Sequence, residues 1–123
     1  MRILIIDDQA QFLDTVAAML MLDPEIEAVC PALGAREGLK AAAELHPDVV
    51  LTDFSMPDMN GIEVIRCLKA DSDPPRVAMM SFHAEPEYRE MALRMGADAY
   101  LVKSELDREL VPTLKRLAVK LTE

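Results

Sequence analysis

The stretch that decides the fold is DVVLTDFSMPDMNG, residues 48–61. Its apolar run at 49–51 is typical of a buried strand, and the proline, asparagine and glycine that follow are typical of a loop. Asp53 stands at the junction, where the strand should end. An acid there is either an ordinary turn residue or a chemical group, and the other strand ends of the chain decide between the two.

Four more short apolar runs lie along the chain, at residues 3–6, 28–30, 77–80 and 99–102, and segments with helical periodicity separate them. The apolar stripes of these segments are Phe12, Val16, Met19 and Leu20; Ala35, Leu39, Ala42 and Ala43; Val64, Ile65 and Leu68; Tyr88, Met91, Ala92 and Met95; and Leu106, Leu110, Leu114, Leu117 and Leu121. Five strand–helix pairs in strict alternation predict an α/β fold, with a parallel sheet covered on both faces.

Two prolines refine this prediction. Pro31 closes the second run and cannot donate to a central ladder, which places that strand at an edge of the sheet. The flavodoxin-like, doubly wound order 2-1-3-4-5, with five strands and five helices, meets this requirement. Pro112 interrupts the last helical pattern. It either kinks a continuous helix or marks the start of a helix that follows a loose turn over 104–110, and the leucine spacing favours the continuous helix.

The length of the chain predicts a single domain over residues 1–123. Residues 1–60 hold 11 acidic and 3 basic side chains, whereas residues 61–123 hold 11 and 10. This acidity argues against direct nucleic-acid binding and suits a carboxylate site for a cation, although solubility alone would also explain it. We expect no membrane span and no signal peptide. Cys30 and Cys67 form no CxxC motif, which fits a reduced cytoplasm and two small buried residues.

The carboxyl ends of parallel strands lie on one side of a sheet, where ligands bind. In the order 2-1-3-4-5, four neighbouring strands end at chemical groups: Asp7 and Asp8, Asp53, Ser81, and Lys103. The carboxylates, with the backbone carbonyl of Ser55, suit Mg²⁺ or Mn²⁺. Ser81 and Lys103 would donate a hydrogen bond and a positive charge to a phosphoryl group on Asp53.

Four motifs, in this order and each closing a strand, make the chain resemble the receiver domain of bacterial two-component response regulators over all 123 residues. They are IIDD (5–8), DVVLTDFSMPDMNG (48–61), MMS (79–81) and GADAYLVK (96–103). The resemblance implies phosphorylation at Asp53, metal binding by Asp7 and Asp8, phosphoryl binding by Lys103, a switch formed by Ser81 and Tyr100, and tuning of the phosphate lifetime by Ser55 and His83.

By this resemblance, a histidine kinase or a histidine phosphotransfer protein would donate the phosphoryl group, in the cytoplasm. The chain would be a signalling domain and not an enzyme. It would catalyse only its own phosphorylation and its own slow dephosphorylation. Phosphorylation would turn Tyr100 inward and alter the surface around it. The segment GADAYLVKSELDREL resembles receivers joined to helix-turn-helix domains, so the output would be a DNA-binding domain outside this chain or self-dimerisation.

Other interpretations stay open. A Mg²⁺-dependent phosphatase with an aspartate nucleophile shares the Asp, Ser and Lys set, but usually carries an acid where this chain has Ser55. A degenerate receiver that is never phosphorylated is a further alternative, but it would not need the complete set of acids, serine and lysine that this chain carries. Ser55 and His83 are equally ordinary as solvated loop residues. The family often has a cis proline after its lysine, whereas Ser104 stands here, which leaves the conformation of the Lys103–Ser104 bond open.

Overall fold

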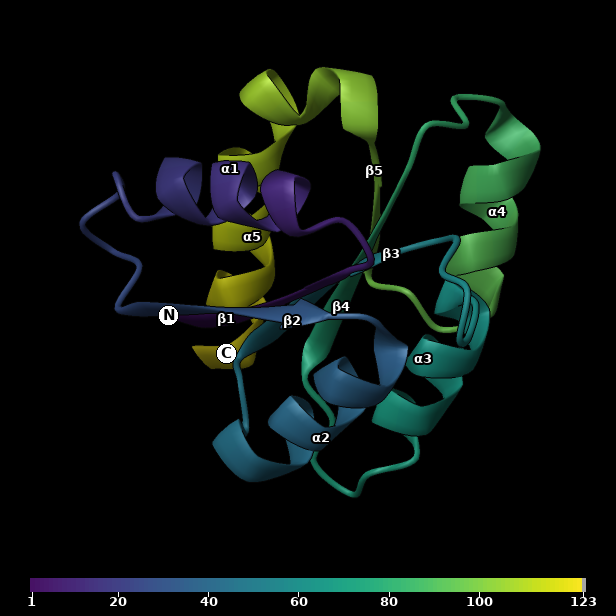
Figure 1. The fold of residues 1–123 in the computed structure, drawn as a ribbon, viewed down its shortest axis with the longest axis horizontal. Helices are drawn as coiled ribbons and strands as arrows, with labels where there is room; N and C mark the ends of the chain where they lie inside the picture. Colours follow the sequence, from purple (N-terminus) through teal and green to yellow (C-terminus); the bar gives the residue numbers. More distant parts are fainter. Residues whose placement is uncertain (123) are drawn as a thin grey trace.

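Five parallel strands form one sheet in the order β2-β1-β3-β4-β5, as the sequence predicts (Figure 1). The computed structural model describes residues 1–122 and the side chains of residues 1–119. The strands are β1 (Arg2–Asp7), β2 (Ala28–Leu33), β3 (Val49–Asp53), β4 (Arg76–Ser81) and β5 (Ala99–Val102). The helices are α1 (Ala10–Leu20), α2 (Ala35–Leu45), α3 (Gly61–Lys69), α4 (Pro86–Arg94) and α5 (Leu106–Thr122), with a short 3₁₀ turn, η1 (Lys103–Glu105), before α5.

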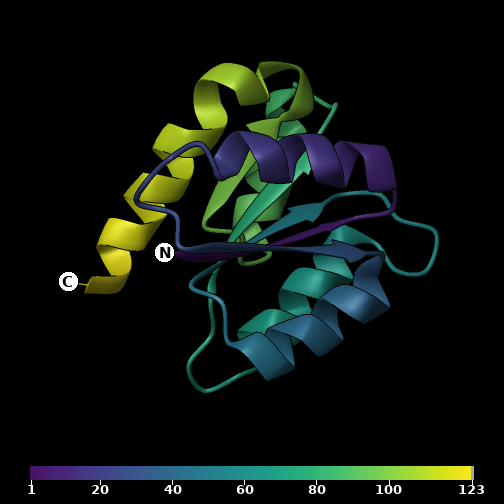
Figure 2. The same ribbon diagram turned by 60° about the vertical axis from the view of Figure 1, so that its left-hand side comes forward.

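The sheet is covered on both faces, so the molecule has two apolar cores. Alternate strand residues point to opposite faces because the side-chain period of a strand is two. Ile3 and Ile5 therefore pack under α1 and α5, whereas Leu4 and Ile6 pack with α2 and α3. Figure 2 shows α1 and α5 on one side of the sheet and α2 and α3 on the other. The continuous apolar runs of the strands follow from this double coverage.

The two prolines lie where the favoured predictions place them. Pro31 is exposed in β2, which pairs with β1 alone and forms an edge of the sheet. Pro112 lies inside α5, which is continuous from Leu106, so the alternative of a helix that starts near Pro112 is wrong. Proline has no N–H, so the carbonyl of Arg108 loses its helical partner, and both residues lie on the exposed side of the helix. Leu121 lies outside the residues whose side chains are described.

Some predictions of burial are wrong. Cys67 is exposed, because α3 turns Val64, Ile65 and Leu68 toward the sheet and leaves Cys67 on the outer side. Cys30 is partly buried. Ala43 and Met95 are also exposed, at the outer margin of the predicted stripes of α2 and α4.

The open question at Lys103 is also answered: no peptide bond within the described residues is cis, so the Lys103–Ser104 bond is trans. The chain goes directly from β5 into the turn η1 and then into α5. Among the helices of the described residues, none combines the length and the apolar character that crossing a bilayer requires.

Candidate functional site

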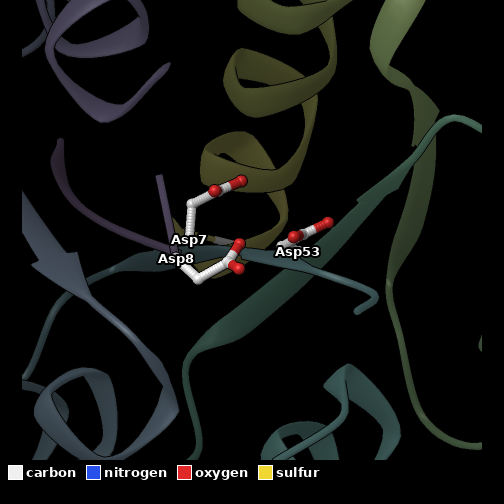
Figure 3. A group of neighbouring side chains, drawn as sticks. All are labelled: Asp7, Asp8 and Asp53. Atoms are coloured by element: carbon white, nitrogen blue, oxygen red, sulfur yellow. The ribbon is translucent and has the colours of Figure 1, made fainter. Parts of the chain in front are cut away.

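Three carboxylates meet beyond the carboxyl ends of β1 and β3. Asp7 ends β1, Asp8 follows it, and Asp53 ends β3. One oxygen from each of these carboxylates lies within 4.8 Å of the others, in the same space beyond the strand ends (Figure 3). The strand order that the sequence predicts is therefore sufficient to bring residues 7 and 53 together, because β1 and β3 are neighbours.

Asp7 is the most rigidly held of the three. Its side chain is fully buried, and its Oδ1 accepts the backbone N–H of Gln9 at 2.9 Å. Its Oδ2 accepts a hydrogen bond from Lys103 Nζ, also at 2.9 Å. Asp8, in contrast, is exposed. The two adjacent acids therefore differ in role: Asp7 fixes the lysine, and Asp8 faces the solvent from which a cation would arrive.

Lys103 joins the two buried acids. Its ammonium lies 2.9 Å from Asp7 Oδ2 and 3.2 Å from Asp53 Oδ1, and its side chain is only 8% exposed. Two aromatic rings flank the same ammonium, with Nζ 4.5 Å from the centre of the Phe12 ring and 5.2 Å from that of Phe82. The negative faces of aromatic rings attract cations, so these rings add to the attraction of the carboxylates.

The surroundings of Asp53 raise the pKa of its carboxyl group. Burial is the largest cause, and the negative charges of Asp7 and Asp8 act in the same direction. The positive charge of Lys103 opposes them without cancelling them. An ionised Asp53 is therefore held at a cost in free energy, and a group that brings positive charge to this site would relieve it.

An open cavity of about 230 Å³ lies at this site, and predicted site residues line it. Asp8, Asp53, Ser55, Ser81, His83 and Lys103 all contribute to its walls. Ser81 is buried at the end of β4, and its Oγ accepts the backbone N–H of His83 at 3.1 Å. That hydrogen bond leaves the proton of the Ser81 hydroxyl free to be donated.

Tyr100 is already in the inward position in this structure. Its side chain is buried, and its hydroxyl donates a hydrogen bond of 2.6 Å to the backbone carbonyl of His83. The resemblance implies that phosphorylation of Asp53 turns this ring inward. The inward position is thus accessible to the unmodified chain, because the loop after β4 offers a carbonyl that satisfies the buried hydroxyl.

The loop between β3 and α3 is tied closely to its neighbours. A Cβ at Gly61 would lie 2.5 Å from the carbonyl oxygen of Asp53, so only glycine allows this approach of α3 to the strand end. Asp58, in the middle of the loop, accepts the N–H groups of Ala35 at 3.2 Å and Arg36 at 3.0 Å. These hydrogen bonds, led by that of Arg36, lower the pKa of the Asp58 carboxyl group.

The aromatic neighbours of the site are the residues that the sequence did not reveal. Phe12 and Phe82 flank Lys103, and Phe54 and Tyr88 pack with His83. Two of these rings could have been suspected from the sequence, because Phe54 and Phe82 directly follow the predicted site residues Asp53 and Ser81. Ring orientation depends on loop geometry, however, and hydropathy patterns do not encode it.

The sequence of this chain is similar to a known protein family and to characterised relatives. The family model of the response regulator receiver domain matches residues 3–115. The nitrate/nitrite response regulator protein NarL of Escherichia coli (strain K12) is 34% identical over 116 residues, which are 94% of this chain and 54% of that protein. The transcriptional regulatory protein DegU of Brevibacillus brevis is 33% identical over 118 residues, 95% of this chain and 50% of that protein. The chain thus spans about half the length of these relatives.

Solved structures agree with this fold. A response regulator receiver domain protein from Clostridium thermocellum has a TM-score of 0.89 and 27% identity, with 98% of this chain and 96% of that chain covered. A DNA-binding response regulator of the LuxR family from Staphylococcus aureus has a TM-score of 0.85 and 26% identity, with 95% and 98% covered. The likeness extends over nearly the whole of both chains.

Proposed function

The chain belongs to the response regulator receiver domains of two-component systems, and from this premise we propose that Asp53 accepts a phosphoryl group in the presence of Mg²⁺ or Mn²⁺. The observation that carries the proposal is the environment of Asp53. Its buried carboxylate lies 3.2 Å from the Lys103 ammonium and within 4.8 Å of the other two acids, beside the hydroxyl-bearing end of β4. A plain turn residue would have no need of these neighbours.

The donor we propose is the phosphorylated imidazole of a histidine kinase or a histidine phosphotransfer protein. An oxygen of the Asp53 carboxylate attacks the phosphorus, a P–O bond forms, and the P–N bond breaks. The donor imidazole leaves with the bonding electron pair. Positioning and neutralisation of charge carry most of such a transfer, and we expect Lys103 and Ser81 to contact the equatorial oxygens. Slow attack of water on the same phosphorus would return the chain to its resting form.

The residues fit a hard divalent cation. Carboxylate oxygens are the ligands that Mg²⁺ prefers, and Asp8 and Asp53 would supply them, with the backbone carbonyl of Ser55. Asp7 would bind the ion directly or through a water molecule. The hydrogen bonds that its two oxygens already accept from Gln9 and Lys103 favour the route through water. The ion would supply positive charge that offsets the acids and the phosphoryl oxygens. Mn²⁺ has the same preference for oxygen ligands.

The proposed output is a change of surface on the side of α4, β5 and α5. Ser81 would move toward the phosphoryl group, and the position of Tyr100 would follow. Ser55 and His83, which line the cavity, are proposed to tune how long the phosphoryl group persists. The acidic chain itself would bind neither nucleic acid nor membrane, and it would act in the cytoplasm.

The partner that receives the signal is proposed from the relatives. NarL is a response regulator, DegU a transcriptional regulatory protein, and each is about twice the length matched here. A DNA-binding output domain outside this chain is therefore one proposed target, and self-dimerisation is the other. A protein-glutamate methylesterase of Koribacter versatilis, 36% identical over 119 residues, shows that such domains also occur in enzymes, where only 32% of the protein is matched.

The test is phosphorylation by acetyl phosphate with Mg²⁺, read by intact mass. Wild type should gain one phosphoryl group, Asp53→Asn should gain none, and Asp14→Asn, which alters an exposed acid on α1, should match wild type. Equal labelling of Asp53→Asn would refute the proposal, and absence of labelling in wild type would favour the degenerate receiver. Rapid turnover of p-nitrophenyl phosphate by wild type would instead favour the phosphatase.

A further inference from the structure

His83 is held from four directions. Its backbone N–H donates to Ser81 Oγ at 3.1 Å, and its carbonyl accepts from the Tyr100 hydroxyl at 2.6 Å. Its imidazole lies flat on the ring of Tyr88, with the ring centres 4.1 Å apart and the planes 7° from parallel. The ring of Phe54, which follows Asp53, lies in an edge-on arrangement with the same imidazole, with the ring centres 6.4 Å apart. One residue thus connects the cavity, the buried tyrosine and helix α4.

The stack with Tyr88 is the side-chain contact that ties His83 to α4, beside a backbone hydrogen bond of 3.1 Å from the Tyr88 N–H to the Glu85 carbonyl. Residues 82–85, which connect β4 to α4, are all exposed, so little apolar burial fixes their path. Tyr88 belongs to the first turns of α4 and also contacts Phe54 edge-on, with ring centres 6.0 Å apart. Stacked and edge-on aromatic pairs stabilise their arrangement beyond simple burial. Figure 1 shows this loop at the top of the molecule, where it turns down into α4.

The buried position of Tyr100 depends on that loop. A buried hydroxyl that loses its hydrogen-bond partner carries a desolvation penalty. The partner here is a loop carbonyl, and no rigid strand supplies it. If His83 moves away, Tyr100 must either pay that penalty or turn toward water.

We propose that the His83–Tyr88 stack is a latch, in which Tyr88 is a positioning residue that keeps the His83 carbonyl within reach of Tyr100. The latch holds the switch tyrosine inward before any phosphoryl group arrives. It therefore sets how far the resting chain is already biased toward its phosphorylated form. This consequence for signalling rests on the proposed function, whereas the latch itself is a property of the unmodified chain.

The sequence offers a direct test, because the chain has two tyrosines and no tryptophan. Tyr88→Phe keeps an aromatic ring for the stack, Tyr88→Leu removes it, and both leave Tyr100 as the sole tyrosine. Quenching of tyrosine fluorescence by acrylamide, without metal or phosphate, then reports Tyr100 alone. The ratio of exposed to buried Tyr100 should be roughly two- to tenfold higher in Tyr88→Leu than in Tyr88→Phe. Equal quenching in the two variants would overturn the latch.

A second pair of variants guards against a failure of Tyr88→Leu to fold, which circular dichroism would reveal. His83→Phe keeps a ring against Tyr88, and His83→Ala removes it, while the backbone groups that bond Ser81 and Tyr100 remain in both. Amide hydrogen exchange at residues 82–85 should be faster in His83→Ala than in His83→Phe. The same exchange rate in both would contradict the proposal.

The link to signalling is tested with beryllofluoride and Mg²⁺, which mimic a phosphoryl group on Asp53. Tyr88→Leu should bind beryllofluoride two- to tenfold more weakly than Tyr88→Phe, and Leu93→Ala, which truncates an exposed side chain of α4, should bind as wild type does. If Leu93→Ala weakened beryllofluoride binding equally, the effect would come from a general loss of stability in α4, and the proposed connection between the latch and signalling would be overturned. Absence of beryllofluoride binding in wild type would instead count against the proposed function, because the fluorescence test needs no ligand.

Discussion

Lys103 is the residue on which the electrostatics of the site depend. Its ammonium is shared by Asp7 and Asp53, which would otherwise repel each other in a buried setting. Because the lysine side chain is only 8% exposed and lies between two buried acids, loss of the lysine would leave both acids poorly compensated. The site is thus a balance of charges in which the acids still predominate, as the raised pKa of Asp53 indicates.

From this balance we predict that Asp53→Asn stabilises the metal-free chain at pH 7. The raised pKa means that the folded chain binds the proton of Asp53 more tightly than the unfolded chain does, so ionisation of this group lowers stability as pH rises. The variant should melt a few degrees higher than wild type in EDTA. The difference should disappear as pH falls below 3.8, the ordinary value, where both states are protonated. Thermal melts across pH would check this, and a variant that melts lower at pH 7 would contradict it.

Much of the site could be predicted at this scale, since residue type, the alternation of strands and helices and the predicted strand order place Asp7, Asp53 and Ser81 at one edge of the sheet. The contacts of Tyr100 and Phe82 could not. Phe82 is 75% exposed but its ring still lies beside Lys103, and Tyr100 is turned inward by a loop carbonyl. Both arrangements depend on the path of the loop after β4, for which an apolar pattern gives no rule.

Among the elements, the β3–α3 loop joins parts of the fold that the sheet does not connect. Asn60 caps α3 by accepting the N–H of Glu63 at 3.0 Å, and Asp58 accepts two N–H groups at the start of α2. Unsatisfied N–H groups at a helix start attract a carboxylate, both by hydrogen bonding and by the helix dipole. The loop that begins at Asp53 is therefore braced against two helices.

We predict that Asp58→Ala lowers the melting temperature by a few degrees and that Asp58→Asn has a smaller effect, because asparagine keeps an acceptor but loses the charge. The lowered pKa means that the carboxylate stabilises the fold above pH 3.8 and that this contribution is lost as pH falls through the lower folded value. Urea unfolding at pH 7 and at lower pH would measure it. Equal stability of wild type and Asp58→Ala at pH 7 would argue against the brace.

The elements themselves follow closely from the sequence, because five apolar runs and five periodic segments leave few alternative topologies. Leucine spacing correctly favoured a continuous α5 across Pro112, whereas the proline alone would have suggested a break. The error at Cys67 has a physical cause. A small apolar residue fits either side of an amphipathic helix, so its residue type says little about which side it takes.

At the scale of the whole molecule, the excess of acid in residues 1–60 is partly gathered at one site. We predict that Mg²⁺ stabilises wild type, since a ligand that binds only the folded chain adds about 2.7 kcal/mol at a hundredfold excess over its dissociation constant. Asp8→Asn should lose most of this gain, and Asp14→Asn should retain it. Chemical denaturation with and without Mg²⁺ would measure both. A full gain in Asp8→Asn would place the cation elsewhere.

The pairing of Lys103 with Asp7 spans 96 positions of the chain, and this has a consequence for synthesis on the ribosome. Asp7 and Asp53 emerge early, but their shared counter-charge emerges only after the last strand of the sheet. Until β5 docks on β4, a nascent chain carries acids without the lysine that orders them. On the proposed function, a phosphoryl donor that met an unfinished chain would find no complete acceptor, because the lysine that pairs with Asp53 is not yet in place.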